Sequence, residues 1–465
     1  MFPVLLPAPR SPVVCLQFFP NAHQPAPTLN ISVMRLQRGR PNMPRMAHTR
    51  LHRSDDVVEQ PRPRSLLRVA MLTETYPPEV NGVARTVAFM AEGLASRGHA
   101  VQVVRPRQTP DVLQRKDERP PGAEEPPCFI DGAVTQVRTR GFPIPRYPQL
   151  RMGLPAGREL LRLWRRQRPD LVHIATEGPL GWSGLRAARR LGLPVATDFH
   201  TNFHAYSRHY GAAWLAGPIT AWLRHFHNRA DCTLVPTEEL ADDLGARGFE
   251  RLGIVGRGVD PSVFSPAKRS DELRARWGAG PDTLVALCVS RFAREKNFPL
   301  VIDAYEAMRR ARRNTRLVLV GDGPMADELK RRNVGYIVAG RLVNGALSAH
   351  YASADAFLFP STSETFGNVT LEAMASGLGV VAYRYAAARQ HIEHEHSGLL
   401  ASYDDRDAFI TQAVRLALYP ALARDLGRAA RAVAERVTWE RITEDFERAL
   451  RYSLERGPVA RSSAV

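Results

Sequence analysis

The sequence predicts an α/β protein built from two Rossmann-like, doubly wound parallel sheets. From Leu66 onward, short apolar runs of strand length alternate with helical patterns, and this alternation is typical of parallel sheets covered by helices. The alternation pauses near residues 256–261 and then starts again. The sequence therefore predicts one Rossmann-like domain on each side of the pause, with a cleft between them.

The first predicted domain covers residues 66–260. Its helices carry apolar residues at helical spacing, and Gly98 is placed to end the first of them. The expected strands are 67–72, 100–104, 170–174 and 194–199, and the expected helices are 83–97 and 182–191.

The second predicted domain covers residues 261–438. A further helix is predicted over residues 439–455. It resembles the closing helix of known proteins with two such domains, in which that helix crosses back onto the first domain. The expected strands are 283–290, 316–320, 356–361 and 379–382, and the expected helices are 299–312, 325–332 and a short one that ends at Gly377.

Residues 1–65 are rich in Pro and Arg and show no sustained periodicity, so we expect a disordered extension there. No apolar run approaches the 18 or more residues of a membrane-spanning helix, and prolines interrupt the apolar start of the chain, which argues against a signal peptide. The four cysteines, Cys15, Cys128, Cys232 and Cys288, form no metal-type pairs. We expect reduced, mostly buried thiols in a cytoplasmic protein.

The composition limits the function classes. The chain has 465 residues, of which 44% are apolar, and a formal net charge of +17. This length fits two to three domains, and the charge favours anionic partners such as nucleotide sugars, nucleic acid or acidic lipid headgroups. A nucleic-acid-binding protein should also interleave its basic residues with stacking aromatics or carry a known module. The sequence shows neither feature, which argues against nucleic acid as the partner.

The most informative stretch is residues 363–377, where seven residues separate two carboxylates, Glu364 and Glu372. The stretch leads from a loop into a short helix. The first amides of that helix, from about Gly367 to Thr370, are expected to lack backbone partners and to favour an anion. Carboxylates on either side of such a site could accept hydrogen bonds from hydroxyl pairs. A nucleotide sugar presents both phosphates and hydroxyl pairs.

Together with the Ala-Met-Ala-Ser-Gly that follows Glu372 and the strands on either side, this pattern resembles the retaining glycosyltransferases of family 4, which have the GT-B fold. The resemblance covers about residues 66–455. It implies that Glu372 accepts hydrogen bonds from the donor ribose and that Glu364 lies close to the sugar and holds its 3- and 4-hydroxyls. The residues between them that are expected to border the donor are Phe366, Gly367 and Asn368.

Two loops of the expected cleft extend the resemblance. Asn81 and Gly82 lie between the first strand and the first helix, where ligands meet the carboxyl edge of a doubly wound sheet. They match the Asn-Gly-Val loop whose backbone lies near the donor diphosphate and the acceptor. No Gly-x-Gly-x-x-Gly occurs at this turn, which argues against a nicotinamide or flavin enzyme.

The second loop follows the first strand of the second domain and contains Arg291 and Lys296, like the Gly-Arg-Leu-x-x-x-Lys-Asn loop of the family. A guanidinium and an ammonium suit a diphosphate whose charge grows as the bond to the sugar breaks. Gly340 and Arg341 are similar to the segment that borders the nucleotide base. After the strand 379–382 many relatives carry Gly-Gly-x-x-Glu, whereas this chain departs from the pattern.

His200 follows the strand 194–199 at the same expected edge, and the resemblance implies that it contacts the donor sugar near its 6-hydroxyl. Other histidines are close in sequence: His204, His209, His225 and His227. A metal cluster is therefore an alternative, but these spacings match no familiar zinc pattern. We expect no metal and no cofactor.

The resemblance thus predicts a metal-independent transferase that moves a hexose, with mannose or glucose favoured, from a nucleoside diphosphate sugar to a lipid or glycan acceptor. A sugar-nucleotide epimerase of the GT-B fold remains an alternative. A phosphorylase would require a pyridoxal-bearing Lys motif, which the sequence lacks.

A peripheral membrane surface is a further hypothesis. Residues 157–168 form a basic helix with Leu and Trp between its charges, and residues 214–226 are rich in aromatic side chains. Arginines attract anionic lipid while Leu and Trp enter the interface, so the protein could bind the inner face of the plasma membrane. The alternative is an ordinary amphipathic helix docked on its own sheet.

Overall fold

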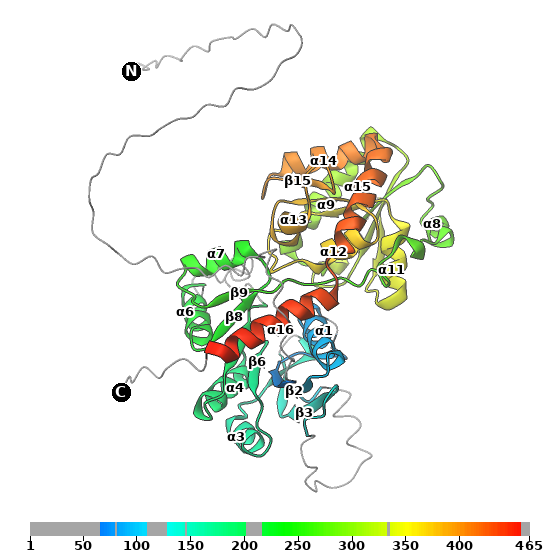
Figure 1. Cartoon of the computed structure of the whole chain (residues 1–465). Coiled ribbons are helices and arrows are strands. Elements are labelled where there is room, and N and C mark those ends of the chain that lie inside the picture. The colour runs from blue at the N-terminus through cyan, green and yellow to red at the C-terminus, as the bar shows by residue number, and fades with distance from the viewer. Residues whose placement is uncertain are drawn as a thin grey trace, which may run out of the picture. The chain divides into compact units, whose positions relative to one another are not determined.

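The computed structural model describes residues 66–79, 81–108, 128–144, 147–200, 216–332 and 335–456. The expected disordered extension, residues 1–65, lies outside the described residues. The described chain contains a seven-stranded and a six-stranded parallel sheet, together with a two-stranded antiparallel ribbon. Figure 1 shows how helices accompany the strands of each sheet. The predicted α/β class with two parallel sheets is confirmed.

The first sheet has the strand order β3-β2-β1-β6-β7-β8-β9. Its strands are β1 (Arg68–Leu72), β2 (Ala100–Pro106), β3 (Val134–Thr139), β6 (Leu171–Ile174), β7 (Val195–Asp198), β8 (Cys232–Val235) and β9 (Leu252–Ile254). The ribbon is formed by β4 (Gly141–Ile144) and β5 (Tyr147–Gly153). The helices of this half are α1 (Gly82–Ser96), α3 (Gly157–Arg166), α4 (Pro179–Arg190), α6 (Ala216–His227) and α7 (Glu238–Ala246).

The second sheet has the strand order β12-β11-β10-β13-β14-β15. Its strands are β10 (Leu284–Val289), β11 (Thr315–Val320), β12 (Ile337–Gly340), β13 (Ala356–Phe359), β14 (Gly379–Tyr383) and β15 (Leu399–Ala401). The helices of this half are α8 (Asp271–Arg276), α9 (Phe298–Ala311), α10 (Ala326–Arg331), α11 (Asn344–Ser353), α12 (Asn368–Ala375), α13 (Ala386–His391), α14 (Arg406–Leu418) and α15 (Pro420–Ala434), with short 3₁₀ turns at Pro266–Lys268 and Arg294–Lys296. The last helix of the described chain is α16 (Trp439–Arg456).

Strand β10 shows why these apolar runs form buried strands. Val285 and Leu287 face one hydrophobic cluster, while Ala286 and Cys288 face another on the opposite side of the sheet. Both faces are therefore covered, which explains a continuous apolar run instead of an alternating one. The strand order also reverses at β10, because β11 lies on one side and β13 on the other. Ligands of doubly wound sheets bind at such reversals, beyond the carboxyl ends of the strands.

Helix α16 packs on the first sheet although it is the last helix of the described chain. Figure 1 shows it lying along α1. The ring of Trp439 stacks on Phe89 at 4.5 Å between centroids, and Arg97 Nε donates a hydrogen bond to Glu447 at 2.7 Å. The chain therefore passes between the two sheets twice. The crossings touch, because the Val259 amide donates to the Val437 carbonyl at 2.9 Å and a Cβ on Gly258 would lie 2.7 Å from the Trp439 nitrogen.

The apolar side of α3 is not available to a membrane. Leu160, Leu163 and Trp164 are buried, and they belong to the core cluster that α3 forms with α4 and the first sheet. The hypothesis that these side chains enter a lipid interface is therefore wrong, and the docked amphipathic helix is correct. The exposed side of α3 keeps its basic residues, Arg158, Arg162, Arg165 and Arg166.

The structure also bears on the predictions about membrane-spanning helices and buried cysteines. Within the described residues, no helix combines the length and apolar character needed to cross a bilayer. Cys232 and Cys288 are buried, but Cys128 is exposed, so burial does not extend to all the described cysteines. Cys15 lies outside the described residues.

Candidate active site

The loops that follow β10 and β13 meet where the order of the second sheet reverses. Lys296 ends the 3₁₀ turn after β10, and Glu364 lies in the loop after β13. Their side chains form an ion pair with 2.5 Å between Lys296 Nζ and Glu364 Oε1, and each side chain is 14% exposed. Parallel strands bring their carboxyl ends to one edge, so residues 68 positions apart in the chain share one site.

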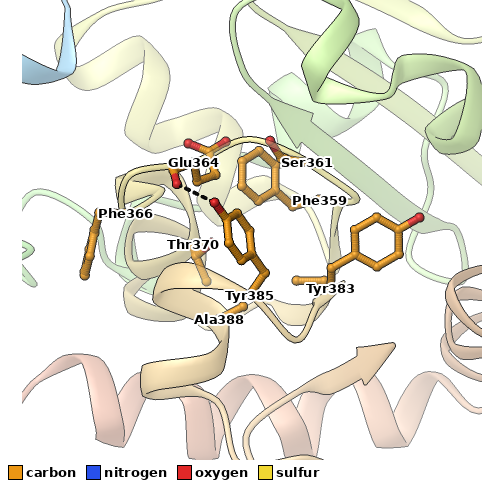
Figure 2. Close-up of a pocket in the computed structure, with 9 residues that line it drawn as sticks. Phe359, Ser361, Glu364, Phe366, Thr370, Tyr383, Tyr385 and Ala388 are labelled. Atoms are coloured by element: carbon orange, nitrogen blue, oxygen red, sulfur yellow. Dashed lines mark hydrogen bonds between the residues drawn. The ribbon is translucent and has the colours of Figure 1, made fainter. Parts of the chain in front are cut away.

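The loop that carries Glu364 is held from below. Tyr385 donates a hydrogen bond from its hydroxyl to the Glu364 carbonyl at 2.8 Å, and Figure 2 shows this hydroxyl pointing at the loop. Gly367 has a φ of +91°, and a Cβ there would lie 3.5 Å from Glu364 Cγ. Because this φ favours glycine, the turn that starts α12 depends on Gly367. The lining of the small pocket beside the loop includes Phe359, Ser361, Tyr383 and Tyr385.

Arg291 is oriented by an acid of its own turn. Its Nη2 lies 2.7 Å from Glu295 Oε1, and the Arg291 side chain is 37% exposed while that of Glu295 is buried. Burial alone would raise the pKa of Glu295, but the hydrogen bond from Arg291 lowers it. One edge of the Arg291 guanidinium is therefore held by the Glu295 carboxylate, and the exposed part of the Arg291 side chain can contact an anionic ligand.

Glu372 lies on α12 and is nearly buried. Tyr351 donates its hydroxyl to Glu372 Oε2 at 3.0 Å, and Arg85 donates from Nη1 to Oε1 at 3.2 Å. Burial raises the pKa of Glu372, while Arg85 and Tyr351 oppose that rise. Sequence reasoning missed both partners. Arg85 had a usable signal, since it is a cation in the first turn of the helix that begins at Gly82.

His200 lies in a buried polar cluster at the end of β7. Its Nε2 is 3.1 Å from Asp198 Oδ2, and its Nδ1 is 3.3 Å from Arg257 Nη2. Asp198 is fully buried, and its Oδ2 lies 3.7 Å from His173 Nε2. Burial alone would raise the pKa of Asp198, but His200 and Arg257 lower it overall, and burial lowers the pKa of His173 to about 4.

Both ring nitrogens of His200 thus lie against protein groups. The backbone carbonyl of His200 accepts a hydrogen bond from Thr365 Oγ1 at 2.8 Å, which brings the residue to the loop of Glu364. The contact of the His200 ring with a sugar stays a prediction. Asp198 stood two positions before His200 in the sequence, and its role as the buried counter-charge was not expected.

Asn81 and Gly82 form the start of α1. The Asn81 side chain caps the helix by accepting a hydrogen bond from the Ala84 amide at 2.8 Å, and it donates to Thr75 Oγ1 at 2.6 Å. A Cβ on Gly82 would meet no atom within 4 Å. The surface beside Gly82 is therefore open. Arg85, one turn further, connects this helix to Glu372.

The remaining candidates occupy different settings. Phe366 is buried and belongs to the lining of the small pocket beside the Glu364 loop, and its contact with a donor stays a prediction. Asn368 is the first residue of α12 and is half-buried. The Thr370 amide donates to the Gly367 carbonyl at 3.0 Å, which corrects the expectation that this amide lacks a partner. Gly340 is the last residue of β12 and Arg341 follows it at the same edge of the sheet, with Arg341 exposed.

Two of the four histidines that could have formed a metal cluster, His225 and His227, lie within the described residues. His227 is buried between Thr197 Oγ1 and Glu177 Oε1, whereas His225 packs against the partly buried ring of Trp182 and the exposed ring of Trp222. His204 and His209 lie outside the described residues. In the part of the chain that the structure describes, no three His, Cys, Asp or Glu side chains are grouped to hold a metal ion. Metal independence stays a prediction.

Comparisons with known proteins agree with this architecture. Residues 80–263 match the family described as Glycosyltransferase Family 4, and residues 283–418 match Glycosyl transferases group 1. A solved sucrose-phosphate synthase from Thermosynechococcus elongatus has a TM-score of 0.64 and 19% identity, covering 84% of this chain and 100% of that one. This likeness supports the fold.

Curated relatives carry the assignment further. The GDP-mannose-dependent alpha-mannosyltransferase of Mycolicibacterium smegmatis is 34% identical over 383 residues, which cover 82% of this chain and 96% of that protein. The alpha-monoglucosyldiacylglycerol synthase of Acholeplasma laidlawii is 27% identical over 337 residues, which cover 68% of this chain and 80% of that protein. The chain therefore belongs to family 4 of the glycosyltransferases, has the GT-B fold, and is a glycosyltransferase.

Proposed function

We propose that the protein transfers a hexose from a nucleoside diphosphate sugar to a lipid or glycan acceptor, with retention of the anomeric configuration and without a metal ion. The observation that carries the proposal is the meeting of Lys296 and Glu364 at the reversal of the second sheet. Glu372 follows in the same segment, on α12. These groups offer a cation for phosphate and two carboxylates for hydroxyl groups.

The charges account for the chemistry of the donor. When the bond between the sugar and the diphosphate breaks, negative charge grows on the leaving phosphate. Lys296 and the exposed part of Arg291 would stabilise that charge, and preorganised donors of this kind commonly contribute most of the reduction of a barrier. Lys296 Nζ donates a hydrogen bond to Glu364 Oε1. An incoming diphosphate carries more charge than one carboxylate and would compete for the ammonium.

The proposed retention assigns no nucleophile to the protein. Glu364 would bind the 3- and 4-hydroxyls of the sugar instead of attacking it, so the leaving phosphate itself would deprotonate the acceptor on the same face. Glu372 would hold the ribose, which keeps the diphosphate in reach of Lys296. In this proposal His200 borders the sugar from the first half, and its carbonyl already faces Thr365.

The identity of donor and acceptor is proposed from relatives. The activity of the Mycolicibacterium smegmatis relative, a GDP-mannose-dependent alpha-mannosyltransferase, favours GDP-mannose. That of the Acholeplasma laidlawii relative, an alpha-monoglucosyldiacylglycerol synthase, favours a diacylglycerol lipid and a glucosyl donor. We therefore propose GDP-mannose as the first donor to test. The exposed arginines of α3 would keep the protein near anionic lipid by charge alone, since the apolar side of that helix is buried.

The decisive experiment measures transfer from GDP-mannose, UDP-glucose and ADP-glucose to diacylglycerol in detergent, with and without EDTA. We expect transfer from one donor, unchanged by EDTA, and an α-linked product by NMR. Lys296→Ala should lower kcat by about 10²- to 10³-fold, which is the loss seen for comparable oxyanion donors. The matched control is Lys330→Ala, because Lys330 is exposed on α10 and remote in sequence. Equal rates for the two variants would contradict the proposal.

The same assay separates a transferase from an epimerase. A transferase releases the nucleoside diphosphate only when an acceptor is present, whereas an epimerase converts one sugar nucleotide into another without any acceptor. Sugar-nucleotide conversion without acceptor would therefore overturn the proposal and support the epimerase.

A further inference from the structure

The contact between Arg85 and Glu372 joins the two halves of the protein at the proposed donor site. Arg85 lies on α1 beside the first sheet, and Glu372 lies on α12 beside the second, 287 positions away in the chain. The guanidinium Nη1 is 3.2 Å from Glu372 Oε1, and the Arg85 side chain is 42% exposed. Glu372, which is proposed to bind the ribose of the donor, is thus contacted by a side chain from the opposite half of the protein.

The carboxylate of Glu372 is held at both oxygens. Tyr351 donates to Oε2 and Arg85 donates to Oε1, so the plane of the carboxylate is fixed. An ionised carboxylate offers about four acceptor positions, and these two donors leave acceptor capacity for two hydroxyl groups. The arrangement suits a pair of neighbouring hydroxyls, such as those of a ribose.

The other described basic residues near α12 contact other groups and not the Glu372 carboxylate. Arg431 on α15 donates to the Ala375 carbonyl at the end of α12, and His391 on α13 lies edge-on to the Phe366 ring. Among the described residues, Arg85 supplies the cation that contacts Glu372, and Tyr351 adds a hydroxyl. A buried acid without a nearby cation is more easily protonated, and a protonated Glu372 would accept fewer hydrogen bonds.

We propose that Arg85 is a positioning residue of the donor site, which reaches across from the first half to hold Glu372 ionised and oriented for the ribose hydroxyls. The inference rests on the proposed function, in which Glu372 binds the ribose. It assigns to α1 a part in nucleotide binding beyond the loop at Asn81 and Gly82. It also makes nucleotide affinity depend on the approach of the two halves, because Arg85 contacts Glu372 only when α1 and α12 are close.

Titration calorimetry with GDP and with UDP from pH 5 to pH 8.5 tests this role. Arg85→Met keeps the length of the side chain and removes its charge. We expect weaker nucleotide binding, with the acidic limit of binding moved to higher pH by about 1 to 3 units, the usual effect of losing an opposite charge. Arg85→Lys should restore most of the wild-type pH profile. Arg310→Met, on the exposed face of α9, is the matched control and should bind like the wild type.

The outcomes separate this inference from the proposed function. Glu372→Gln should bind nucleotide weakly and lose the acidic limit, since no carboxylate remains to titrate. If Glu372→Gln weakens binding but Arg85→Met keeps the wild-type pH profile, the role of Arg85 is refuted while the donor site stands. If the wild type binds neither nucleotide, the donor site and the role of Arg85 both fail. Circular dichroism of each variant shows whether a loss comes from unfolding instead.

Discussion

Replacing Glu447 with Gln should loosen α16 from the first sheet. Glu447 is buried and accepts hydrogen bonds from Arg97 Nε at 2.7 Å and from Arg451 Nε at 2.8 Å, and His99 Nε2 lies 3.4 Å away. Burial alone would raise the pKa of Glu447, but the hydrogen bonds from Arg97 and Arg451 lower it from 4.5 to about 2. Gln keeps the size of the side chain and removes its charge.

The magnitude follows from that pKa. The difference between 4.5 and about 2 corresponds to about 3 kcal/mol, since one pKa unit is worth about 1.4 kcal/mol. Arg97 and Arg451 are partly exposed, so water screens their contacts. We therefore expect Glu447→Gln to lower the free energy of unfolding by about 2 kcal/mol at pH 7.

Urea denaturation followed by circular dichroism measures this loss. Glu444→Gln is the matched control, because Glu444 also contacts Arg97 but is 48% exposed, and it should change the stability by less than about 1 kcal/mol. An acid whose pKa is lowered on folding stabilises the folded protein at pH values above its unfolded-state pKa. This stabilisation is lost as the pH falls through the folded-state pKa. The difference in free energy of unfolding between the wild type and Glu447→Gln should therefore become smaller below pH 4.5. Equal losses for the two variants, or a constant difference at lower pH, would refute the reasoning.

Three further variants test other parts of the structure. Asp198→Asn should cost about 3 kcal/mol, because buried Arg257 loses its counter-charge, and adding Arg257→Met should recover part of the loss in a double-mutant cycle. Ala386→Gly should raise the thermal midpoint by about 1 to 3 °C, because Ala386 has a φ of +50° and relief of that strain slightly exceeds the extra chain entropy of glycine; an unchanged or lower midpoint would contradict this. Trp164→Ala should cost about 3 to 5 kcal/mol in urea denaturation, whereas Arg165→Ala should stay within about 0.5 kcal/mol.

The meeting of Lys296 and Glu364 was accessible from the sequence. Both residues follow strands, and the carboxyl ends of parallel strands share one edge. The passage from a loop into a short helix near Gly367 was also predicted, although Gly367 caps α12 with a left-handed backbone and the helix itself starts at Asn368. Local spacing and a rule of sheet topology were sufficient for these parts of the candidate site.

Other parts depended on packing that spacing does not contain. Arg85 contacts Glu372 across the two halves, and no local pattern fixes how far one helix lies from another 287 positions away. The amphipathic pattern of α3 fits a membrane as well as a core, and only burial of Trp164 decides between them. The contact of the His200 ring with the donor sugar stays a prediction, and the sequence order did not indicate that Asp198 and Arg257 would lie against its two ring nitrogens.

The position of α16 has a consequence for folding during synthesis. A ribosome completes the second sheet, which ends with β15 at Ala401, before it reaches Trp439. The first half, although synthesised first, still lacks the helix that covers Phe89 and the neighbouring apolar residues of α1. Domains usually fold in the order of their synthesis, but here the first half becomes complete last. A chain interrupted before α16 would therefore leave an apolar surface uncovered on the half that was made first.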